Sequence, residues 1–558
     1  MTRRQRIDDL LALAVPEQPA IAPDGSSAVY VLRTVDADAD RTVRNLWRVG
    51  TRDGEPEQLT RGGADSAPAW SPDGTRIAFL RAADGAAQLW LLPAVGGEPE
   101  QLTTLPLGAG RPIWSPDGTA IAFAAPVDLN AAGGEDDAAR TRRGAAPIVT
   151  DRLDYLADGA GYLRTMRNHV HVLDLATRKA RRLTDGDWHA SDPAWSPDGT
   201  LLAYAAATAP DADRTLHCPV YVRSATDPAA PPRLVGLADG VAGTVDWTTD
   251  GTALLVVGYP GRPTGHAHLL RVPLDGGPVT SLSASLDRNV MAGGPGYPGA
   301  LPVTVDGGRS VLFCVRERGD THLYRVPVEG GEPTPVLAGA GRTVAGLSVA
   351  GDTAVALLLT PTSLGELVTV DLTAGGESER TAHGTDVDLY SREEREFTIS
   401  DGTVVHGWVV RDPATTGAGP LLLDVHGGPH NAWNAAADDV HLYHQELAAR
   451  GWTVLLLNPR GSDGYGERFY TAALGGWGVA DAKDLLEPVD ALIAEGVADP
   501  ARLAVTGYSY GAFMTCYLTG IDDRFAAAVA GGVISDLTSG AGTSDAGHLI
   551  GAFELEGG

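Results

Sequence analysis

Residues 507–511 read Gly-Tyr-Ser-Tyr-Gly and carry the pattern in this chain best suited to chemistry. A serine hydroxyl can attack a carbonyl carbon, and flanking glycines leave room for that serine at the tip of a sharp turn. The pattern alone is weak evidence, because the chain holds 70 glycines among 558 residues. Its flanks decide the interpretation: the apolar run 503–506 predicts a strand before the turn, and 512–518 predicts a helix after it. The sequence therefore predicts a nucleophile elbow, with Ser509 as nucleophile between Gly507 and Gly511.

A glycine-rich turn at 426–429, His-Gly-Gly-Pro, follows a predicted buried strand at 421–425. In this position a turn can direct backbone N–H groups at an active site. We therefore expect this turn to supply the second half of an oxyanion hole whose first half is the N–H of Tyr510, with His426 in a structural role. The alternative is an ordinary Gly-Pro loop, and the elbow farther along the chain favours the catalytic interpretation.

Alternating strands and helices in the last third must position these residues. A hairpin is predicted at 397–410, strands at 421–425, 453–457, 503–506 and 525–534, and helices at 443–450 and 481–495. This alternation indicates a doubly wound, mostly parallel sheet. We assign 389–558 to an α/β hydrolase domain.

The preceding two thirds contain a repeat. Trp-Ser-Pro-Asp-Gly occurs at 70–74, 114–118 and 195–199, with degenerate copies near 22–25, 247–251, 305–308 and 350–352. Proline presets a turn, Asp-Gly supplies the positive φ of a tight hairpin, and an alternating apolar strand follows. Short strands at such a period predict a β-propeller of about seven blades over 15–388, after a short N-terminal helix in 1–14.

The repeat is interrupted at about 127–162, where the spacing between copies nearly doubles. An insertion there should lie on one face of the propeller. A binding role and a solvated loop both remain open.

Composition excludes several kinds of function. A net charge of −28 disfavours a nucleic-acid partner held through phosphates. Three scattered cysteines predict no disulfide framework, with Cys516 as a small core residue, and no spacing suggests a metal or cofactor. Acidic residues interrupt the start of the chain and no run of about 18 apolar residues occurs, so we expect a cytoplasmic protein with no membrane contact.

Together these motifs resemble the prolyl oligopeptidase family of serine peptidases, in particular its acylaminoacyl peptidase and dipeptidyl aminopeptidase-like branch. The propeller-then-hydrolase order matches as well, and the motifs are 426–429, Asn-Pro-Arg-Gly-Ser at 458–462, Gly-Tyr-Gly at 464–466, Trp-Gly at 477–478 and 507–515.

The resemblance implies that Ser509 forms an acyl-enzyme with a short peptide substrate, and that the N–H groups of Gly428 and Tyr510 stabilise the oxyanion. It also implies that the propeller over the site limits access by size. It implies no cofactor. Residues 458–466 would form a structural loop that lines the site. Family members are often dimers or larger, but the residues set no oligomeric state. The residues expected to support the site are Gly507, Gly511, His426, Gly427, Asn458 and Arg460.

The family pattern also implies an Asp about 80 and a His about 115 residues after the serine, and this chain ends at Gly558. We interpret Asp536, Asp545 and His548 as scaffold. The expectation is therefore a chain truncated at its C-terminus, with little or no activity because Ser509 lacks its base. The DNA beyond the codon for Gly558 would test this, since it should encode the missing Asp and His.

Two alternatives stay open. One is an esterase on the same hydrolase fold, although such enzymes rarely need a propeller that excludes large peptides. The other is a non-catalytic propeller binding protein with a relic hydrolase domain. The residues do not separate acyl-amino acid, dipeptide and proline preferences.

Overall fold

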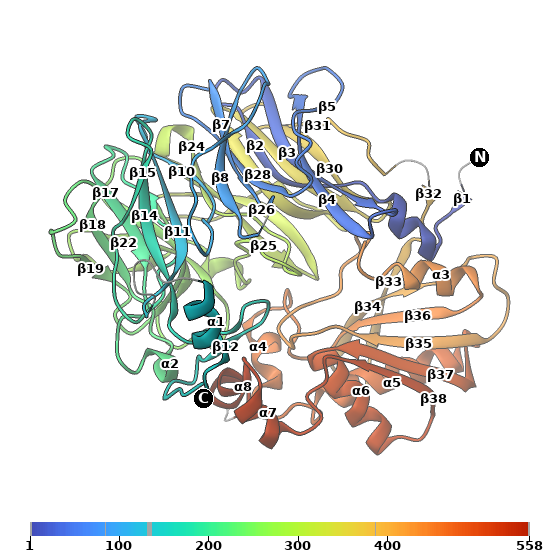
Figure 1. The fold of residues 1–558 in the computed structure, drawn as a ribbon. Helices are drawn as coiled ribbons and strands as arrows, with labels where there is room; N and C mark the ends of the chain where they lie inside the picture. The colour runs from blue at the N-terminus through green and yellow to red at the C-terminus, as the bar shows by residue number, and fades with distance from the viewer. Residues whose placement is uncertain (1–2, 84, 131–136, 385–386, 556–558) are drawn as a thin grey trace.

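The computed structural model describes residues 3–83, 85–130, 137–384 and 387–555. Figure 1 shows two parts side by side, a ring of small sheets and a single larger sheet flanked by helices. Among the helices of these residues, none combines the length and the apolar content that a membrane span needs.

The ring is a propeller of seven four-stranded sheets, as the repeat predicted. Each blade is built from one continuous stretch of chain. The blades, in chain order, are β2 Val15–Ile21, β3 Ser27–Asp36, β4 Arg41–Gly50 and β5 Glu57–Gln58; β6 Asp65–Trp70, β7 Arg76–Arg81, β8 Gln88–Pro93 and β9 Glu100–Gln101; β10 Ile113–Trp114, β11 Ala120–Asp128, β14 Met166–Asp174 and β15 Lys179–Arg182; β16 Ala194–Trp195, β17 Leu201–Ala205, β18 Val220–Ser224 and β19 Arg233–Gly236; β20 Val241–Trp247, β21 Ala253–Tyr259, β22 His268–Pro273 and β23 Thr280–Ser281; β24 Val303–Val305, β25 Ser310–Glu317, β26 Asp320–Pro327 and β27 Thr334–Leu337; β28 Thr343–Ala350, β29 Thr353–Thr360, β30 Ser363–Asp371 and β31 Glu377–Glu379.

The repeated pentapeptide forms the turn between the first two strands of a blade. In the second blade, Asp73 Oδ1 accepts hydrogen bonds from Ser71 Oγ at 2.6 Å and from the Thr75 N–H at 3.0 Å, while Gly74 takes φ +69°. The tryptophan joins blades, because Trp114 Nε1 donates to the Ala69 carbonyl of the blade before it at 3.0 Å. The same motif therefore forms a turn within one blade and attaches that blade to the one before it.

The ring closes through contacts between the first and last blades. Arg380 donates to the carbonyl oxygens of Gly50 and Arg52, and the Ile21 N–H donates to Ser348 Oγ at 3.0 Å. The predicted N-terminal helix is a short 3-10 helix, η1 Ile7–Ala12. Before it, β1 Arg3–Arg4 pairs with β32 Val387–Asp388, a pairing that the sequence did not suggest.

The larger sheet has six strands in the order β33-β34-β36-β35-β37-β38. Its elements are β33 Arg392–Thr398, β34 Val404–Val410, β35 Gly419–Val425, α3 Tyr443–Ala449, β36 Thr453–Asn458, α4 Glu467–Tyr470, η4 Thr471–Ala473, α5 Asp481–Ala494, β37 Ala498–Tyr508, α6 Tyr510–Ile521, β38 Phe525–Gly531, α7 Leu537–Thr543, α8 Gly547–Leu549 and η5 Ile550–Leu555. The predicted α/β hydrolase order is confirmed. The central strands β35, β36 and β37 run parallel and are largely buried, whereas β38 lies at the edge with most of its residues exposed.

The insertion predicted near 127–162 extends the hairpin between β11 and β14. It contains α1 Asp137–Ala145, β12 Leu156–Ala157 and β13 Gly161–Tyr162. Figure 1 shows α1 and β12 between the propeller and the helices that follow β38. The remaining short helices of the described chain are α2 Ala212–Thr215, η2 Ala284–Leu286 and η3 Asp306–Gly308.

Candidate active site

Ser509 occupies the turn between β37 and α6. Its backbone takes φ 58° and ψ −119°, a positive φ that a residue with a side chain rarely adopts. The turn is held by a hydrogen bond from the Ser509 N–H to the Gly531 carbonyl at 2.9 Å and by one from the Phe513 N–H to the Ser509 carbonyl at 3.0 Å. This strand, sharp turn and helix form the predicted elbow.

The glycines of the elbow are required by backbone packing. A Cβ on Gly511 would lie 2.0 Å from the Val425 carbonyl oxygen, and one on Gly507 would lie 2.4 Å from the Gly511 carbonyl carbon. Neither obstacle is a side chain that can rotate away. The elbow therefore presses against the end of β35, which brings Ser509 to the turn that follows that strand.

The turn His426–Pro429 lies beside Ser509 because β35 and β37 are adjacent parallel strands. A Cβ on Gly427 would be 3.6 Å from Ser509 Cβ, and Gly428 takes φ +132°. Among the described residues, no acceptor bonds the N–H of Gly428 or that of Tyr510, the first residue of α6. These two N–H groups are therefore available to a negatively charged oxygen, and the N-terminus of α6 adds a favourable dipole.

His426 is buried behind the turn. Its Nδ1 donates to the Gly427 carbonyl at 2.7 Å, and its Nε2 lies 2.9 Å from Ser462 Oγ. Burial lowers the pKa of His426 to about 4, so its ring is neutral at neutral pH. The ring braces the turn against the following loop and has no hydrogen bond to Ser509.

Asn458 and Arg460 also brace the loop beside the site. Asn458 Oδ1 accepts the Trp433 N–H at 2.8 Å, and its Nδ2 donates to the Trp433 carbonyl at 3.0 Å. Arg460 pairs with the buried Asp484 at 2.7 Å and with Asp401 at 2.9 Å. Both side chains are occupied by the protein itself, so their contacts are structural.

The polar residues after the elbow are engaged elsewhere. Asp536 caps α7 by accepting the N–H groups of Thr538 and Ser539. Asp545 Oδ2 accepts the Asp158 N–H of the insertion at 3.0 Å. His548 lies in α8, and within the described chain none of these three side chains bonds to Ser509.

Two interactions at the site were not suggested by the sequence. Tyr510 donates its hydroxyl to the buried Asp481, which anchors the first turn of α6 to α5. Burial raises the pKa of Asp481.

His430, just after the turn His426–Pro429, stacks on Tyr470 with ring centroids 3.9 Å apart. Its Nδ1 donates to the Gly461 carbonyl at 2.9 Å, and its Nε2 lies 3.1 Å from Glu554 Oε1. The spacing of these residues along the chain predicts neither the pair of Tyr510 with Asp481 nor the contacts of His430.

The propeller covers this edge of the sheet. Asn431, which follows the oxyanion turn, accepts a hydrogen bond from Arg316 of the propeller and donates to the Gly296 carbonyl at 3.4 Å. Arg316 is almost fully buried, and burial lowers its pKa. The edge of the sheet that carries Ser509 therefore faces the propeller.

The described residues hold no cluster of three or more His, Cys, Asp or Glu side chains suited to a metal. Cys218, Cys314 and Cys516 are free thiols. The prediction that Cys516 lies in the core is wrong, since its side chain is exposed. Helix α6 buries Met514, Thr515 and Leu518 instead, and Cys516 falls on the other side of the helix.

Comparisons with known proteins agree with this geometry. A sequence profile described as the prolyl oligopeptidase family matches residues 439–555. An uncharacterized peptidase of Bacillus subtilis, YuxL, is 32% identical over 570 residues, which cover 98% of this chain and 85% of that protein. An acylamino-acid-releasing enzyme of Arabidopsis thaliana is 39% identical over 127 residues, 23% of this chain and 16% of that protein.

Solved structures show the same fold. The acylaminoacyl peptidase of Pyrococcus horikoshii has a TM-score of 0.81 at 20% identity, over 98% of this chain and 82% of that chain. A puromycin-hydrolyzing peptidase of Mycobacterium tuberculosis has a TM-score of 0.72 at 24% identity, over 99% of this chain and 82% of that chain. Both share the arrangement of a propeller and a hydrolase sheet.

Proposed function

The chain belongs to the prolyl oligopeptidase family of serine peptidases, and from that premise we propose that Ser509 is the nucleophile that cleaves short peptides. Its Oγ attacks the scissile carbonyl carbon, the C–N bond breaks, and the amine leaves with a proton while the acyl group stays on Ser509. Water then releases the acid. The single observation that carries the proposal is the strained backbone of Ser509 beside two unbonded N–H groups.

The N–H groups of Gly428 and Tyr510 are proposed to bind the oxyanion. A helix N-terminus and a glycine turn suit this task, because they present fixed donors that need no reorganisation as charge develops. Removing one such donor typically costs about 100-fold or more in kcat.

The substrates are proposed to be short peptides cleaved near an end. The edge that carries Ser509 faces the propeller through Asn431, and this cover supports short chains as the substrates. Relatives named acylamino-acid-releasing enzyme and dipeptidyl-peptidase support an exopeptidase.

Residues 1–558 by themselves are proposed to react slowly. The ring nitrogens of His426 and His430 contact Ser462, Glu554 and backbone carbonyls, and the described residues offer no histidine in a hydrogen bond with Ser509. Without a base the serine hydroxyl keeps its ordinary, very weak acidity. An external base should then restore reactivity.

A fluorophosphonate probe tests both parts. We expect slow labelling of the 558-residue chain at Ser509, and about a tenfold or greater acceleration by added imidazole, which is less than the roughly 100-fold or more that a positioned general base contributes. S509A should not label, whereas S378A, at an exposed serine of β31, should behave as wild type. Labelling at another residue, or none with imidazole, would refute Ser509 as nucleophile. Fast labelling without imidazole would refute the proposal that Ser509 has no base among the described residues.

Two substrates that carry the same acyl group distinguish a peptidase from an esterase. A peptidase should cleave both a peptide anilide and the matching ester, in the presence of imidazole. Cleavage of the ester alone would favour the esterase.

A further inference from the structure

We propose that a pocket where β33 begins and β34 ends binds a small organic phosphate. The pocket has a volume of about 440 Å³ and is lined by arginines from three parts of the chain. These are Arg4 of β1, Arg395 of β33 and Arg411, the residue that follows β34. The proposed peptidase function uses none of them, so the inference stands apart from Ser509.

The pocket lies at the end of the sheet opposite to Ser509. Val497, which lines the pocket, comes just before β37 begins, whereas Ser509 comes just after β37 ends. Strand β37 has 11 residues, and at roughly 3.3 Å per residue they span about 30 Å. A short peptide bound at Ser509 does not reach that far. The pocket is therefore separate from the catalytic site.

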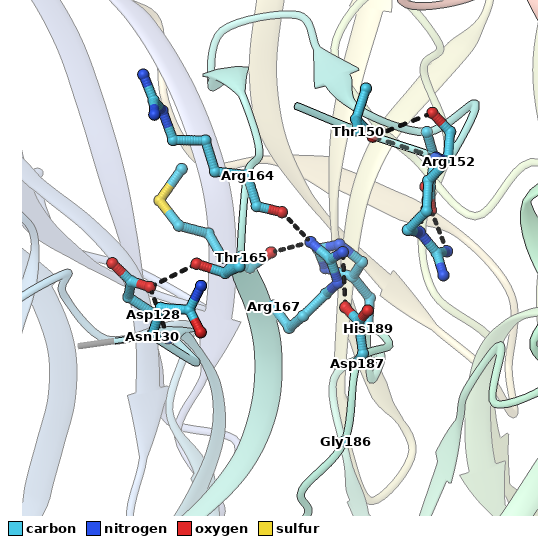
Figure 2. A network of polar contacts seen from close by, with 12 residues as sticks. Asp128, Asn130, Thr150, Arg152, Arg164, Thr165, Arg167, Gly186, Asp187 and His189 are labelled. Atoms are coloured by element: carbon cyan, nitrogen blue, oxygen red, sulfur yellow. Dashed lines mark hydrogen bonds and ion pairs between the residues drawn. The ribbon is translucent and has the colours of Figure 1, made fainter. Parts of the chain in front are cut away.

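Arg411 lines this pocket without an acidic partner. Its Nη2 donates to the Gly417 carbonyl, but its buried Nε has no hydrogen bond, and no carboxylate of the described chain forms an ion pair with it. Figure 2 shows the contrasting case of Arg167, whose guanidinium pairs with Asp187 at 2.7 Å and also donates to two carbonyls. Because an arginine cannot lose its proton in a protein, an unpaired one beside a pocket favours an anion there.

The acidic residues of the pocket do not neutralise it. Asp412 Oδ2 accepts the Tyr390 hydroxyl at 3.0 Å, and its Oδ1 accepts the Ala414 N–H at 2.8 Å. Glu393 is largely exposed and lies 3.9 Å from Arg395. Three arginines against two carboxylates leave the lining with a formal charge of +1, although the chain as a whole carries −28. The pocket therefore attracts anions in a protein that otherwise repels them.

The other two arginines are held at the pocket by their own contacts. Arg4 Nη1 donates to the Leu389 carbonyl at 3.1 Å, and its guanidinium lies 4.3 Å from the centre of the Tyr390 ring. Arg395 Nη2 donates to Glu495 at 2.7 Å in an exposed pair, which contributes little to stability. A guanidinium has five N–H donors, so Arg395 can bind an anion as well.

A phosphate group suits these donors better than a carboxylate does. Phosphate offers three strong acceptor oxygens and nearly two negative charges at neutral pH, so several donors can share it. The hydroxyls of Ser391 and Thr415 also line the pocket and have no hydrogen-bond partner within the described chain. Val409 and Val497 add an apolar part to the lining, which suits the organic part of a phosphate ester.

The test measures binding to the intact 558-residue chain and needs no catalysis. Phenyl phosphate, inorganic phosphate and benzoate are titrated by isothermal calorimetry at about pH 7.5 and constant ionic strength, where both phosphates are mostly dianions. We expect phenyl phosphate to bind more tightly than inorganic phosphate by about threefold or more, because its ring buries apolar surface. Benzoate should bind about tenfold more weakly than phenyl phosphate, because it carries one charge and two acceptor oxygens.

Two variants locate the site, each with a matched control. R411Q should weaken phenyl phosphate about tenfold or more, whereas R309Q makes the same change at an exposed arginine outside the pocket and should bind as wild type. S391D places a carboxylate in the pocket at an exposed position, so it should weaken binding as strongly without disturbing the fold. S378D, at the exposed serine of β31, should bind as wild type.

Hydrogen exchange shows where the ligand lies. Phenyl phosphate should slow exchange at 389–397 and 409–417 and leave 426–429, beside Ser509, unchanged. Protection at 426–429 instead, no binding of either phosphate, or equal binding by S391D and S378D would overturn the site. Benzoate that binds as tightly as phenyl phosphate would overturn the choice of a phosphate.

Discussion

Replacing Gly511 by alanine should disrupt the elbow more than any other single methyl group in α6. The new Cβ would lie 2.0 Å from the Val425 carbonyl oxygen, 2.8 Å from its carbonyl carbon and 2.9 Å from the His426 carbonyl oxygen. Contacts under 3.0 Å are essentially never made by real Cβ atoms, so the backbone must move by about 1 Å. All three obstacles are backbone atoms of β35 and the oxyanion turn.

Overpacking of a core typically costs about 1–3 kcal/mol, and a backbone clash belongs at the upper end. We therefore expect G511A to lower the free energy of unfolding of the hydrolase domain by about 3 kcal/mol. The shift also separates Ser509 from the turn, because the three obstructing atoms belong to Val425 and His426, which lead directly into Gly427. The rate at which the fluorophosphonate labels Ser509 in the presence of imidazole should therefore fall as well.

The matched control is G520A in the same helix. No atom lies within 4 Å of a Cβ at Gly520, so alanine should stabilise α6 by about 0.5–1 kcal/mol through its better helix propensity. Hydrogen exchange of peptides that cover 510–521, measured over a urea series, reports this helix separately from the propeller. G511A should lower the stability of α6, and G520A should raise it. If G511A matches wild type in exchange and in labelling, the elbow is not pressed against β35 as described.

Two further predictions concern stability. Burial lowers the pKa of His426 to about 4, below its ordinary value near 6.5. Between these pH values the native state therefore binds fewer protons than the unfolded chain. The contribution of the neutral ring to stability should be complete above pH 6.5, and the free energy of unfolding should fall by on the order of 3 kcal/mol toward pH 4. Urea midpoints measured from pH 7.5 to 4.5 should therefore fall less steeply in H426N, and parallel slopes would contradict the neutral buried ring. In the propeller, R81A removes the ion-pair partner of the fully buried Asp65 and leaves it only the hydroxyl of Thr60, which should cost about 3–5 kcal/mol. R182A, whose pair with Asp185 is exposed, should change stability by less than about 1 kcal/mol in the same denaturation series, and equal losses in both would refute the burial argument.

Much of the architecture follows from local sequence. The pentapeptide at 70–74 contains the proline, aspartate and glycine that its turn uses, so its repetition alone predicted blades. The strand and helix on either side of Ser509 likewise predicted the elbow. These predictions succeed because the interactions that form a turn lie within a few residues of one another.

The site required contacts between distant residues. The Gly507 and Gly511 pattern is local, but its cause is the Val425 carbonyl of another strand. The pairing of Tyr510 with Asp481 joins two helices, and that of His430 with Glu554 joins distant parts of the chain. No spacing rule connects such residues, because their proximity depends on the order of strands in the sheet. Cys516 was misassigned for a related reason, since which side of α6 faces the sheet depends on packing.

The sequence by itself predicted the architecture: a propeller of about seven blades followed by a hydrolase sheet, with a serine at an elbow and a glycine turn proposed to bind the oxyanion. Only the tertiary structure decided how these parts meet. It turned the insertion at 127–162 from an unassigned loop into a strap bonded to Gly542 and Asp545, and it brought the oxyanion turn beside Ser509. The physical reason is that turns are fixed by neighbouring residues, whereas the meeting of two domains is fixed by surfaces that only the folded chain possesses.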